Sequence, residues 1–214
     1  MIINRVMTKN PIFIHPDMPI NDVRSLMDKE KIGHLPVLDK NSAIVGLVTK
    51  KDLIKSGPSS ATSLDMYEIS YLISKMCAKD VMVKSVITTD ENEVVEEAAR
   101  ILADNDIGCL PVMRGKRLVG IITDTDLFHV FLKAFGVRHP GVRVTCNIQE
   151  KPGQLARLAH AIAERGGNIV ALVTSEGDDN SRRMTTIKIS GINLNEVESI
   201  VKSFDDIELE DIRE

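Results

Sequence analysis

The sequence predicts a mixed α/β protein, in which two copies of a β-α-β-β-α unit are followed by a smaller β-α-β-β-α-β domain. Two repeated stretches carry this prediction. IGHLPV (32–37) recurs as IGCLPV (107–112) with five of six residues identical, and GLVTKKDL (46–53) recurs as GIITDTDL (120–127) with four of eight identical. The repeat then stops near residue 136, where a new succession of apolar patterns begins. Two copies of one unit in one chain imply a pseudo-twofold axis.

Each repeat starts with an extended segment, TKNPIFI or VKSVITT, and continues into a helix with one apolar face. That face carries Ile20, Val23, Leu26 and Met27 in the first repeat, and Val95, Ala98, Ile101 and Leu102 in the second. Two short apolar strands joined by a turn-rich loop predict a hairpin, and a second helix opens after Thr49 or Thr123. The offset between the repeats falls from 75 to 74 positions in the hairpin loop, where a one-residue change is tolerated.

The segment between the repeats combines a Gly/Pro/Ser-rich loop (56–63) with a predicted helix (64–76). Tyr67 and Tyr71 lie four residues apart on this helix. We expect them to pack between the repeats, and the alternative is that they line a ligand site.

The third domain follows a predicted boundary at GVRHPG (136–141), which contains two glycines and a proline. Alternating apolar residues from Val142 predict a strand, and a helical stripe from Leu155 ends at GGN (166–168). Two strands, IVALV and MTTIKI, flank the polar loop SEGDDNSRR; a helix capped by Asn193 and a closing strand, DIELEDI, complete the domain. The expected division of the chain is 1–60, 61–77 (connecting helix and linker), 78–135, 136–141 (linker) and 142–214.

Composition excludes several classes of function. The net charge of −4 lacks the basic excess of a general nucleic-acid binder, and no apolar run is long enough to span a membrane. The N-terminus does not resemble a signal peptide, and three scattered cysteines without a CxxC motif indicate neither a zinc site nor disulfides, so we expect a reduced cytoplasmic protein. Because no HExxH, GxSxG or phosphate-binding P-loop motif occurs, we expect no catalytic residues, no metal site and no enzyme activity.

The repeated G-x-x-T-x-x-D stretch has two interpretations. A Thr at a strand-to-helix junction with an Asp three residues later forms a capping box, which is purely structural. The same groups suit a nucleoside phosphate, because a carboxylate accepts hydrogen bonds from a ribose diol, and a hydroxyl with helix-terminal amides suits a phosphate. The glycine inside the strand indicates a bulge or a close backbone approach. Recurrence of all three residues with the IG-x-LPV strand favours the nucleotide interpretation.

The doubled motif VM(T/V)K…IGxLPV…G(L/I)(V/I)TxxDL resembles a pair of cystathionine-β-synthase (CBS) domains over residues 1–135. The resemblance implies that the Asp binds ribose hydroxyls, that the Thr contacts phosphate, and that backbone before LPV and in the extended segment lines the adenine. The first site would then use Thr8, Pro11, Ile12, Gly33, His34, Thr49 and Asp52. The second would use Val83, Val86, Ile87, Gly108, Cys109, Thr123 and Asp126. The implied ligand is an adenine nucleotide (AMP, ADP or ATP) with or without magnesium, and no obligatory cofactor.

The two sites differ in charge, because Lys50-Lys51 follows Thr49 where Asp124-Thr125 follows Thr123. We expect one stronger site and leave open which it is. His34 is a surface histidine of the hairpin or a ligand contact, and the resemblance also implies that it reaches phosphate across the pseudo-twofold. Cys109, at the matching position, is expected to be a small buried residue. Asp124 is expected to be a solvated acid at a helix start.

The stretch QEKPGQLARLAHAIAERGGNI (149–169) resembles the start of an ACT domain. The resemblance implies edge-to-edge pairing and an amino acid or similar metabolite bound at that interface. The implied ligand residues are Lys151, Pro152, Gly153, Gln154 and Leu155, with Asn168 and Ile169 opposite. The alternative is a plain strand-to-helix turn in a dimerisation domain. A CBS pair followed by an ACT domain resembles the AcuB-type acetoin-utilisation family.

The leading hypothesis is a non-catalytic sensor that binds adenine nucleotide between its CBS units, forms a homodimer and acts on an unidentified regulated protein. The alternatives are an adaptor whose sites stay empty, an S-adenosylmethionine sensor, and a nucleotide-dependent hydrolase or transferase.

Overall fold

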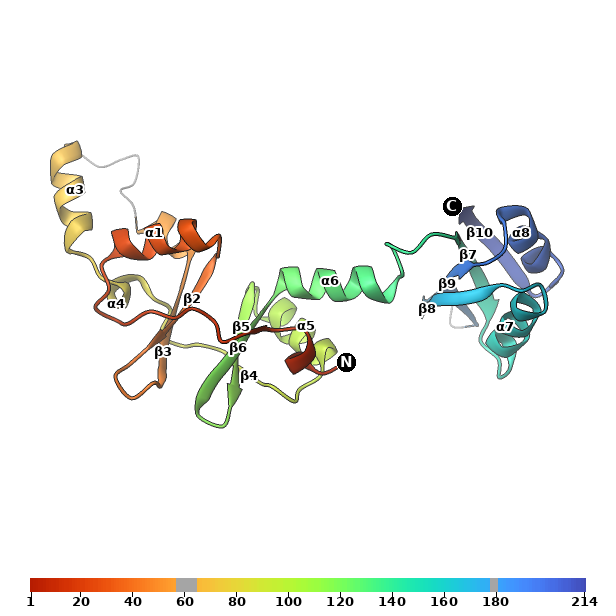
Figure 1. The fold of residues 1–214 in the computed structure, drawn as a ribbon, viewed down its shortest axis with the longest axis horizontal. Helices are drawn as coiled ribbons and strands as arrows, with labels where there is room; N and C mark the ends of the chain where they lie inside the picture. The colour runs from red at the N-terminus through yellow and green to blue at the C-terminus, as the bar shows by residue number, and fades with distance from the viewer. Residues whose placement is uncertain (57–64, 178–180) are drawn as a thin grey trace. The chain divides into compact units, whose positions relative to one another are not determined.

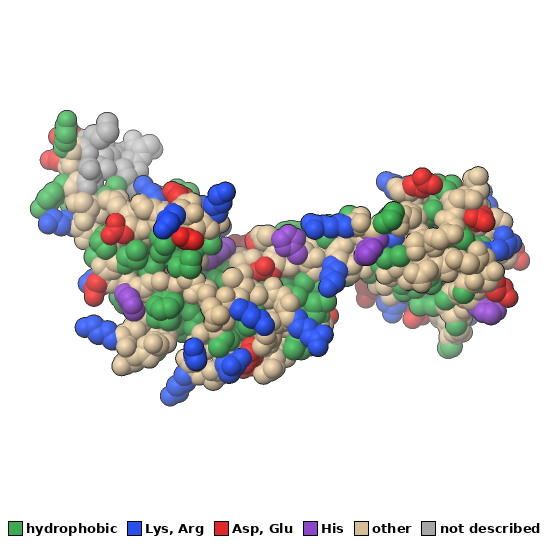
Figure 2. All heavy atoms as spheres, in the orientation of Figure 1, with side chains coloured by type: hydrophobic (Ala, Val, Ile, Leu, Met, Phe, Trp, Pro, Cys, Tyr) green, Lys and Arg blue, Asp and Glu red, His purple; other side chains and the backbone are tan. Residues whose placement is uncertain are grey.

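The computed structural model describes residues 1–56, 65–177 and 181–214. The chain divides into two compact units, 1–127 and 128–214, each with its own core. No helix of the described residues is long and apolar enough to cross a bilayer. Acidic and basic side chains are interspersed on the face shown in Figure 2, in keeping with the nearly balanced charge.

The first repeat follows the predicted order of elements (Figure 1). Its elements are η1 (Ile3–Arg5), β1 (Thr8–Lys9), α1 (Ile20–Glu30), β2 (His34–Leu38), β3 (Ile44–Thr49) and α2 (Lys50–Lys55). Helix α1 buries Ile20, Val23 and Met27, which are the residues of the predicted apolar stripe apart from Leu26. The hairpin β2–β3 supplies the opposite wall of this core, because Leu35, Val37 and Val48 are fully buried.

The second repeat comprises α4 (Ala78–Val81), β4 (Thr89–Asp90), α5 (Val95–Asp104), β5 (Cys109–Arg114), β6 (Arg117–Thr123) and α6 (Asp124–Ala134). It has the same helix-hairpin-helix order after its first segment, whereas the short elements before it differ: α4 replaces the 3-10 helix η1, and β4 lies at the end of that segment where β1 lies near its start. The helix between the repeats, α3 (Met66–Lys75), packs against α1. The predicted loop 56–63 lies, except for Ser56, outside the described residues.

Each repeat begins with a segment that precedes its first long helix, α1 or α5, and that we call the leading segment. Part of each leading segment pairs with the other repeat. Strand β1 pairs with β6 of the second repeat, where Thr8 lies opposite Ile121, and one sheet therefore has the order β1-β6-β5-β4. Val83 exchanges two backbone hydrogen bonds with Leu47 of β3, at 2.9 and 3.0 Å. The cores follow this exchange: Ile3 and Met7 pack in the second repeat's core, and Ala78 packs in the first repeat's core.

The end of each leading segment returns to its own hairpin. Ile14 pairs in parallel with Val37 of β2, and Thr89 of β4 pairs in parallel with Val112 of β5. Each segment thus connects the two sheets, and the pseudo-twofold predicted from the repeat is visible in these matched pairings.

The third domain forms one antiparallel sheet with two helices over one face (Figure 1). Its elements are β7 (Val142–Gln149), α7 (Gln154–Glu164), β8 (Asn168–Glu176), β9 (Arg182–Ser190), α8 (Leu194–Lys202) and β10 (Ile207–Arg213). The predicted β-α-β-β-α-β order is confirmed, and the strand order β10-β7-β9-β8 is that of a ferredoxin-like fold. Asn193 caps α8 as predicted, accepting a hydrogen bond of 3.0 Å from the Glu196 amide.

Two details differ from the predictions. The polar loop SEGDDNSRR is shorter than predicted, because the β8–β9 ladder continues through the pairs Ser175–Met184 and Glu176–Arg183. Tyr67 and Tyr71 are 88% and 63% exposed, so the prediction that they pack between the repeats is wrong.

Candidate nucleotide site

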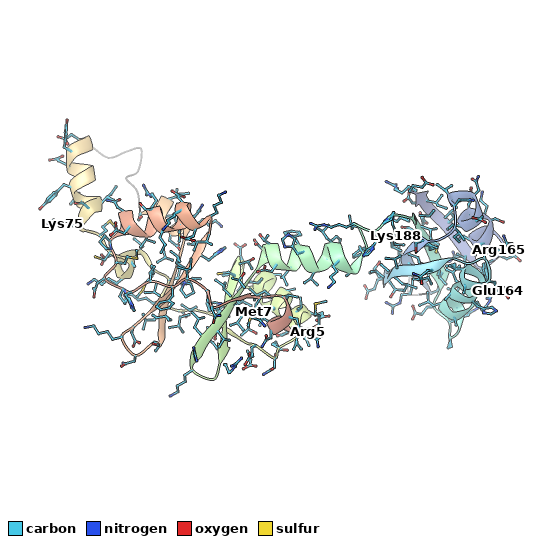
Figure 3. The ribbon with its side chains drawn as sticks, in the orientation of Figure 1. Arg5, Met7, Lys75, Glu164, Arg165 and Lys188 are labelled. Carbon is cyan, nitrogen blue, oxygen red and sulfur yellow. The ribbon has the colours of Figure 1, made fainter. Side chains whose placement is uncertain are left out.

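The strand glycines of the repeated motif give room to a methionine from the other repeat's leading segment. A Cβ on Gly46 would collide with the Met82 side chain, and a Cβ on Gly120 would collide with Met7, which is labelled in Figure 3. The hairpin register also shifts beside both glycines, directly after the pairs Val37–Gly46 and Val112–Gly120. Both parts of the expectation, a bulge and a close approach, are therefore confirmed.

The Thr and Asp of each motif form the capping box that the structural interpretation requires. Asp52 Oδ2 accepts hydrogen bonds from the Thr49 amide (2.9 Å) and hydroxyl (2.7 Å), and the Asp52 amide donates to the Thr49 hydroxyl (3.3 Å). Asp126 Oδ2 accepts from the Thr123 amide and hydroxyl, both at 2.8 Å. The cap uses one oxygen of each carboxylate. Within the described parts of the chain, Oδ1 of each Asp has no hydrogen-bond partner and stays available for a further donor.

A cavity of about 560 Å³ lies beside the first motif, within the size range of small-molecule sites. Its lining residues come from both repeats and include apolar, basic, acidic and uncharged polar side chains. They are Gly33, His34, Leu47, Thr49, Lys50, Lys51, Asp52, Lys55, Val83, Ser85, Val86, Ile87, Asp106, Ile107, Gly108, Cys109 and Asp124.

This cavity combines residues that the CBS resemblance implies for two different sites. Gly33, His34, Thr49 and Asp52 are joined by Val83, Val86, Ile87, Gly108 and Cys109, which had been assigned to the second site. Thr8, Pro11 and Ile12 do not line it. The structure groups these residues differently from the prediction because the leading segments cross: Val83 pairs with Leu47, two residues before Thr49.

The residues predicted near the second motif are grouped by pseudo-symmetry. Thr8 pairs with Ile121, two residues before Thr123, so Thr8, Pro11 and Ile12 stand in the same relation to Thr123 and Asp126. The signal that could have revealed this crossing is the VM dipeptide, whose methionine needs a glycine in the partner hairpin.

His34 lies at the junction of the two repeats. A Cβ on Gly108 would be 3.3 Å from His34 Nε2 and 3.6 Å from Asp124 Oδ2, so the imidazole extends toward the second repeat. Burial lowers the pKa of His34, and the negative charges of Asp124 and Asp52 oppose that shift. The imidazole is therefore neutral near pH 7, and the lysines supply the positive charge of the cavity.

Cys109 takes the equivalent position in the second repeat. It is 2% exposed, and burial, with a smaller contribution from Asp124, raises the pKa of its thiol to about 12. This confirms the expectation of a small buried residue, because a thiol with so high a pKa carries no thiolate at neutral pH.

Two charged residues of the cavity were missed or underestimated. Lys55 follows Lys51 by four positions on α2 and so shares its helix face, a spacing that the sequence contains. Asp124 is exposed, as expected for a helix-start acid, but it also lines the cavity of the other repeat's motif. The Lys50 ammonium lies 3.6 Å from Asp28, whereas Lys51 and Lys55 have no acidic partner within the described ranges.

The predicted ACT ligand residues separate into two places. Lys151, Gln154 and Leu155 line a small cavity at the β7–α7 turn, where Gly153 has a φ of +89°. Asn168 and Ile169 pair with Ser190 and Ile189, at the opposite end of the sheet from Arg183. Within one chain the two groups are therefore not brought together.

The fold and the cavity define a class of protein: a pseudo-symmetric pair of α/β repeats with a cavity at their junction, followed by a ferredoxin-like domain. The sequence matches the CBS domain over residues 3–58 and 78–133, more than half of the chain, and the TTHA0829-like ACT domain over residues 140–213. The chain belongs to the CBS domain family and carries a C-terminal ACT-like domain.

Solved structures agree with this assignment. An acetoin utilization protein (AcuB) from Vibrio cholerae is 27% identical with a TM-score of 0.54, covering 65% of this chain and 98% of that one. The CBS domain pair of protein MJ0100, solved with 5′-methylthioadenosine and S-adenosyl-L-methionine, is 26% identical with a TM-score of 0.52, covering 65% and 98%. CBSX2, solved with AMP, is 27% identical with a TM-score of 0.51, covering 64% and 98%.

The enzymes among the relatives match only through part of their length. L-aspartate semialdehyde sulfurtransferase of Methanocaldococcus jannaschii is 26% identical over 61% of this chain, which spans 23% of that protein. Inosine-5′-monophosphate dehydrogenase of Thermoplasma acidophilum is 38% identical over 53% of this chain, which spans 20% of that protein.

Proposed function

We propose that this protein is a non-catalytic regulator that binds an adenine nucleotide between its two CBS repeats. The observation that carries the proposal is the cavity beside Thr49. Here a carboxylate with one oxygen outside the cap meets an apolar wall and two lysines, Lys51 and Lys55, that have no acidic partner among the described residues. Each of these three features suits a different part of a nucleotide.

The apolar wall and the carboxylate suit adenosine. Val86 and Ile87 from the leading segment of the second repeat, with Leu47, offer an apolar surface for a purine ring. Asp52 Oδ1 is free to accept from a ribose hydroxyl while Oδ2 keeps the cap intact. By pseudo-symmetry we assign Thr8, Pro11, Ile12, Thr123 and Asp126 to a second site, with Gly108 and Cys109 adjoining both.

The lysines suit a phosphate. The Thr49 hydroxyl already donates to Asp52 and accepts from its amide, so it has only one remaining lone pair for a ligand. Lys51 and Lys55 are thus the principal groups for neutralising AMP, ADP or ATP, with or without magnesium. The relative solved with AMP supports this choice.

A second candidate ligand is S-adenosylmethionine, the ligand of the MJ0100 pair. Asp106 and Asp124 favour it, because these carboxylates line the same cavity and could face a cationic tail. Titration with AMP, ADP, ATP and S-adenosylmethionine separates the two candidate ligands.

The remaining parts of the proposal concern context. We infer a cytoplasmic homodimer in which the ACT domain supports dimerisation and reads an amino acid or another small metabolite. Its output acts on a regulated protein, and the likeness to AcuB supports a link to acetoin utilisation. We retain the domain division 1–60, 61–77, 78–135, 136–141 and 142–214.

Thermal shift and calorimetric titration with AMP, ADP, ATP and S-adenosylmethionine test the proposal. A ligand at about 100 times its Kd stabilises the native state by about 2.7 kcal/mol. Asp52→Asn should remove the response to the preferred nucleotide. The matched control is Asp80→Asn, since Asp80 makes the same type of cap with the Cys77 amide (2.8 Å) on α4 but does not line the cavity.

Three results would contradict this function. No response to any adenosine ligand favours an adaptor whose sites stay empty. If Asp52→Asn and Asp80→Asn bind nucleotide equally well, Asp52 acts only as a helix cap. Phosphate release from ATP by pure protein, lost in Asp52→Asn, points to a hydrolase.

A further inference from the structure

The ACT-like domain contains a cavity of its own, about 320 Å³ in volume, between the start of α7 and the helix-covered face of the sheet. Its lining residues come from β7, the β7–α7 turn, α7, β8 and β9. They are Ile148, Gln149, Glu150, Lys151, Gln154, Leu155, Thr174, Arg183 and Thr185.

This cavity shares Lys151, Gln154 and Leu155 with the site that the ACT resemblance implies, but not the residues expected opposite them. It lies within one copy of the fold, and neither Asn168 nor Ile169 contributes to it. Its floor is formed by Thr185 of β9 and by Thr174, which is paired with Thr185 across the β8–β9 ladder.

Thr185 is the observation that points to a ligand. Its side chain is fully buried, and its hydroxyl has no hydrogen-bond partner in the described structure. A buried hydroxyl without a partner is unfavourable, and valine has the same shape without that penalty. A threonine at this position is explained if a bound molecule supplies the missing partner.

The other side of the cavity favours an anion. Helix α7 has eleven residues, starts at Gly153 without a side-chain cap, and has no acidic residue in its first turn. The Gln154 amide donates to the Lys151 carbonyl (3.4 Å), and the amides of the next two residues keep their partial positive charge. Lys151, two residues before the helix N-cap, has no acidic partner among the residues described.

The remaining charges restrict the ligand further. Glu150, the one carboxylate among the described lining residues, is held in an ion pair by Arg183. An amino acid brings an ammonium group that needs a free acceptor, and this pair leaves the cavity without an uncommitted carboxylate. Gln154 is also engaged, because its amide donates to Asp206 (2.8 Å) and its carbonyl accepts from Arg157 (2.9 Å).

We propose that this cavity binds a small carboxylate with a hydroxyl or keto oxygen beside the carboxyl group. Lys151 and the two amides that follow Gln154 hold the carboxylate, and the Thr185 hydroxyl bonds the second oxygen, as donor to a ketone or acceptor from an alcohol. Ile148 and Leu155 contact the carbon skeleton. The proposal rests on the sensing role given to the ACT domain above and names the class of ligand.

The test is calorimetric titration of the full chain with pyruvate, L-lactate, L-alanine and L-serine. Pyruvate or lactate should bind, and the amino acids should bind at least tenfold more weakly. Thr185→Val and Lys151→Gln should each weaken binding about tenfold or more. Lys202→Gln, an exposed lysine of α8 paired with Glu198, is the matched control and should bind like the unmodified protein.

Thr185→Val separates a binding role from a structural one. The variant should melt at the same temperature as the unmodified protein or higher without ligand, and should lose the shift that pyruvate or lactate produces. The proposal is overturned if neither acid binds, if the amino acids bind more tightly, or if both variants bind normally. Titration of the same samples with ATP and AMP shows whether the CBS sites function, so a failure here is distinguishable from a failure of nucleotide binding.

Discussion

The two CBS repeats share a backbone but differ in the charges that follow the conserved Thr. In the first repeat, Lys50, Lys51 and Lys55 line the cavity, and the matching positions of the second repeat carry Asp124, Thr125 and His129. The capping boxes, the strand glycines and the crossing methionines are the same in both. The comparison teaches that both repeats keep the residues that build the strand-to-helix junction, while the charged residues that follow it differ. The Thr49 cavity is therefore the stronger candidate for a phosphate ligand.

The largest expected effect comes from exchanging these charges. The triple variant Lys50→Asp/Lys51→Thr/Lys55→His gives the first repeat the second repeat's residues. We expect roughly 100-fold weaker ATP binding at low salt, because each lost cation removes about 1 kcal/mol of attraction. Calorimetric titration at two salt concentrations measures it, and the difference should shrink at high salt.

The reciprocal variant, Asp124→Lys/Thr125→Lys/His129→Lys, is the control for general charge effects. It should not reproduce the loss seen in the first variant. If both triple variants bind ATP equally well, the lysines do not decide which ligand is bound.

The next effect tests the packing that both repeats share. Gly46→Ala should destabilise the fold by about 2 kcal/mol, because the added methyl overpacks against Met82. Gly120→Ala should lose a similar amount against Met7. Urea unfolding measures both, and Met82→Ala combined with Gly46→Ala should recover part of the loss attributed to the clash. Unchanged stability in both glycine variants would mean that the methionines move aside freely.

A smaller effect comes from the caps. Thr49→Ala and Thr123→Ala should each cost about 1 kcal/mol of stability, since each removes the same side-chain cap from a helix start. Equal losses with unequal effects on nucleotide affinity would sharpen the contrast between the sites. Markedly unequal stability losses would contradict the equivalence of the two caps.

The smallest effect concerns His34, whose counterpart Cys109 does not titrate between pH 5 and 7. Burial lowers the pKa of His34 below its ordinary value near 6.5, so the unfolded chain binds the proton more readily than the native one. Stability from the neutral imidazole is complete above pH 6.5 and decreases as the pH falls through the folded-state pKa. His34→Gln should lose less stability over this pH range than the unmodified protein, by a difference of less than about 1 kcal/mol.

Thermal unfolding between pH 5 and 8 measures this difference. His160→Gln is the control, because His160 is exposed and pairs within α7 with Glu164. A curve that His34→Gln leaves unchanged would show that the imidazole is not held neutral by burial.

Local patterns in the sequence predicted most of the fold. The apolar stripe from Ile20 gave helix α1, and the T-x-x-D spacing gave both caps and the first residue of the helix that follows each of them. The pairing of Thr8 with Ile121 does not follow from such local patterns, because it joins residues more than 100 positions apart. The exposure of Tyr67 and Tyr71 could not be predicted for a similar reason. Their spacing defines a helix face but not which element packs on that face.

The candidate site was predictable in its polar residues and less so in its assembly. Asp52 and Thr49 follow from the repeat, whereas Val86 and Ile87 join them only through the crossing of a distant segment. Thr185 gives no sequence signal, because a threonine in a strand is ordinary and only its missing partner makes it informative.

The pairing of β1 with β6 also delays the completion of the fold during synthesis. Residues 8 and 9 are synthesised more than 100 residues before their strand partners at 120 and 121. At typical translation rates this interval is on the order of ten seconds. Through this interval the nascent chain holds a strand with no edge to join, and the first hairpin also lacks Val83, so the two repeats complete each other only when the second one has emerged.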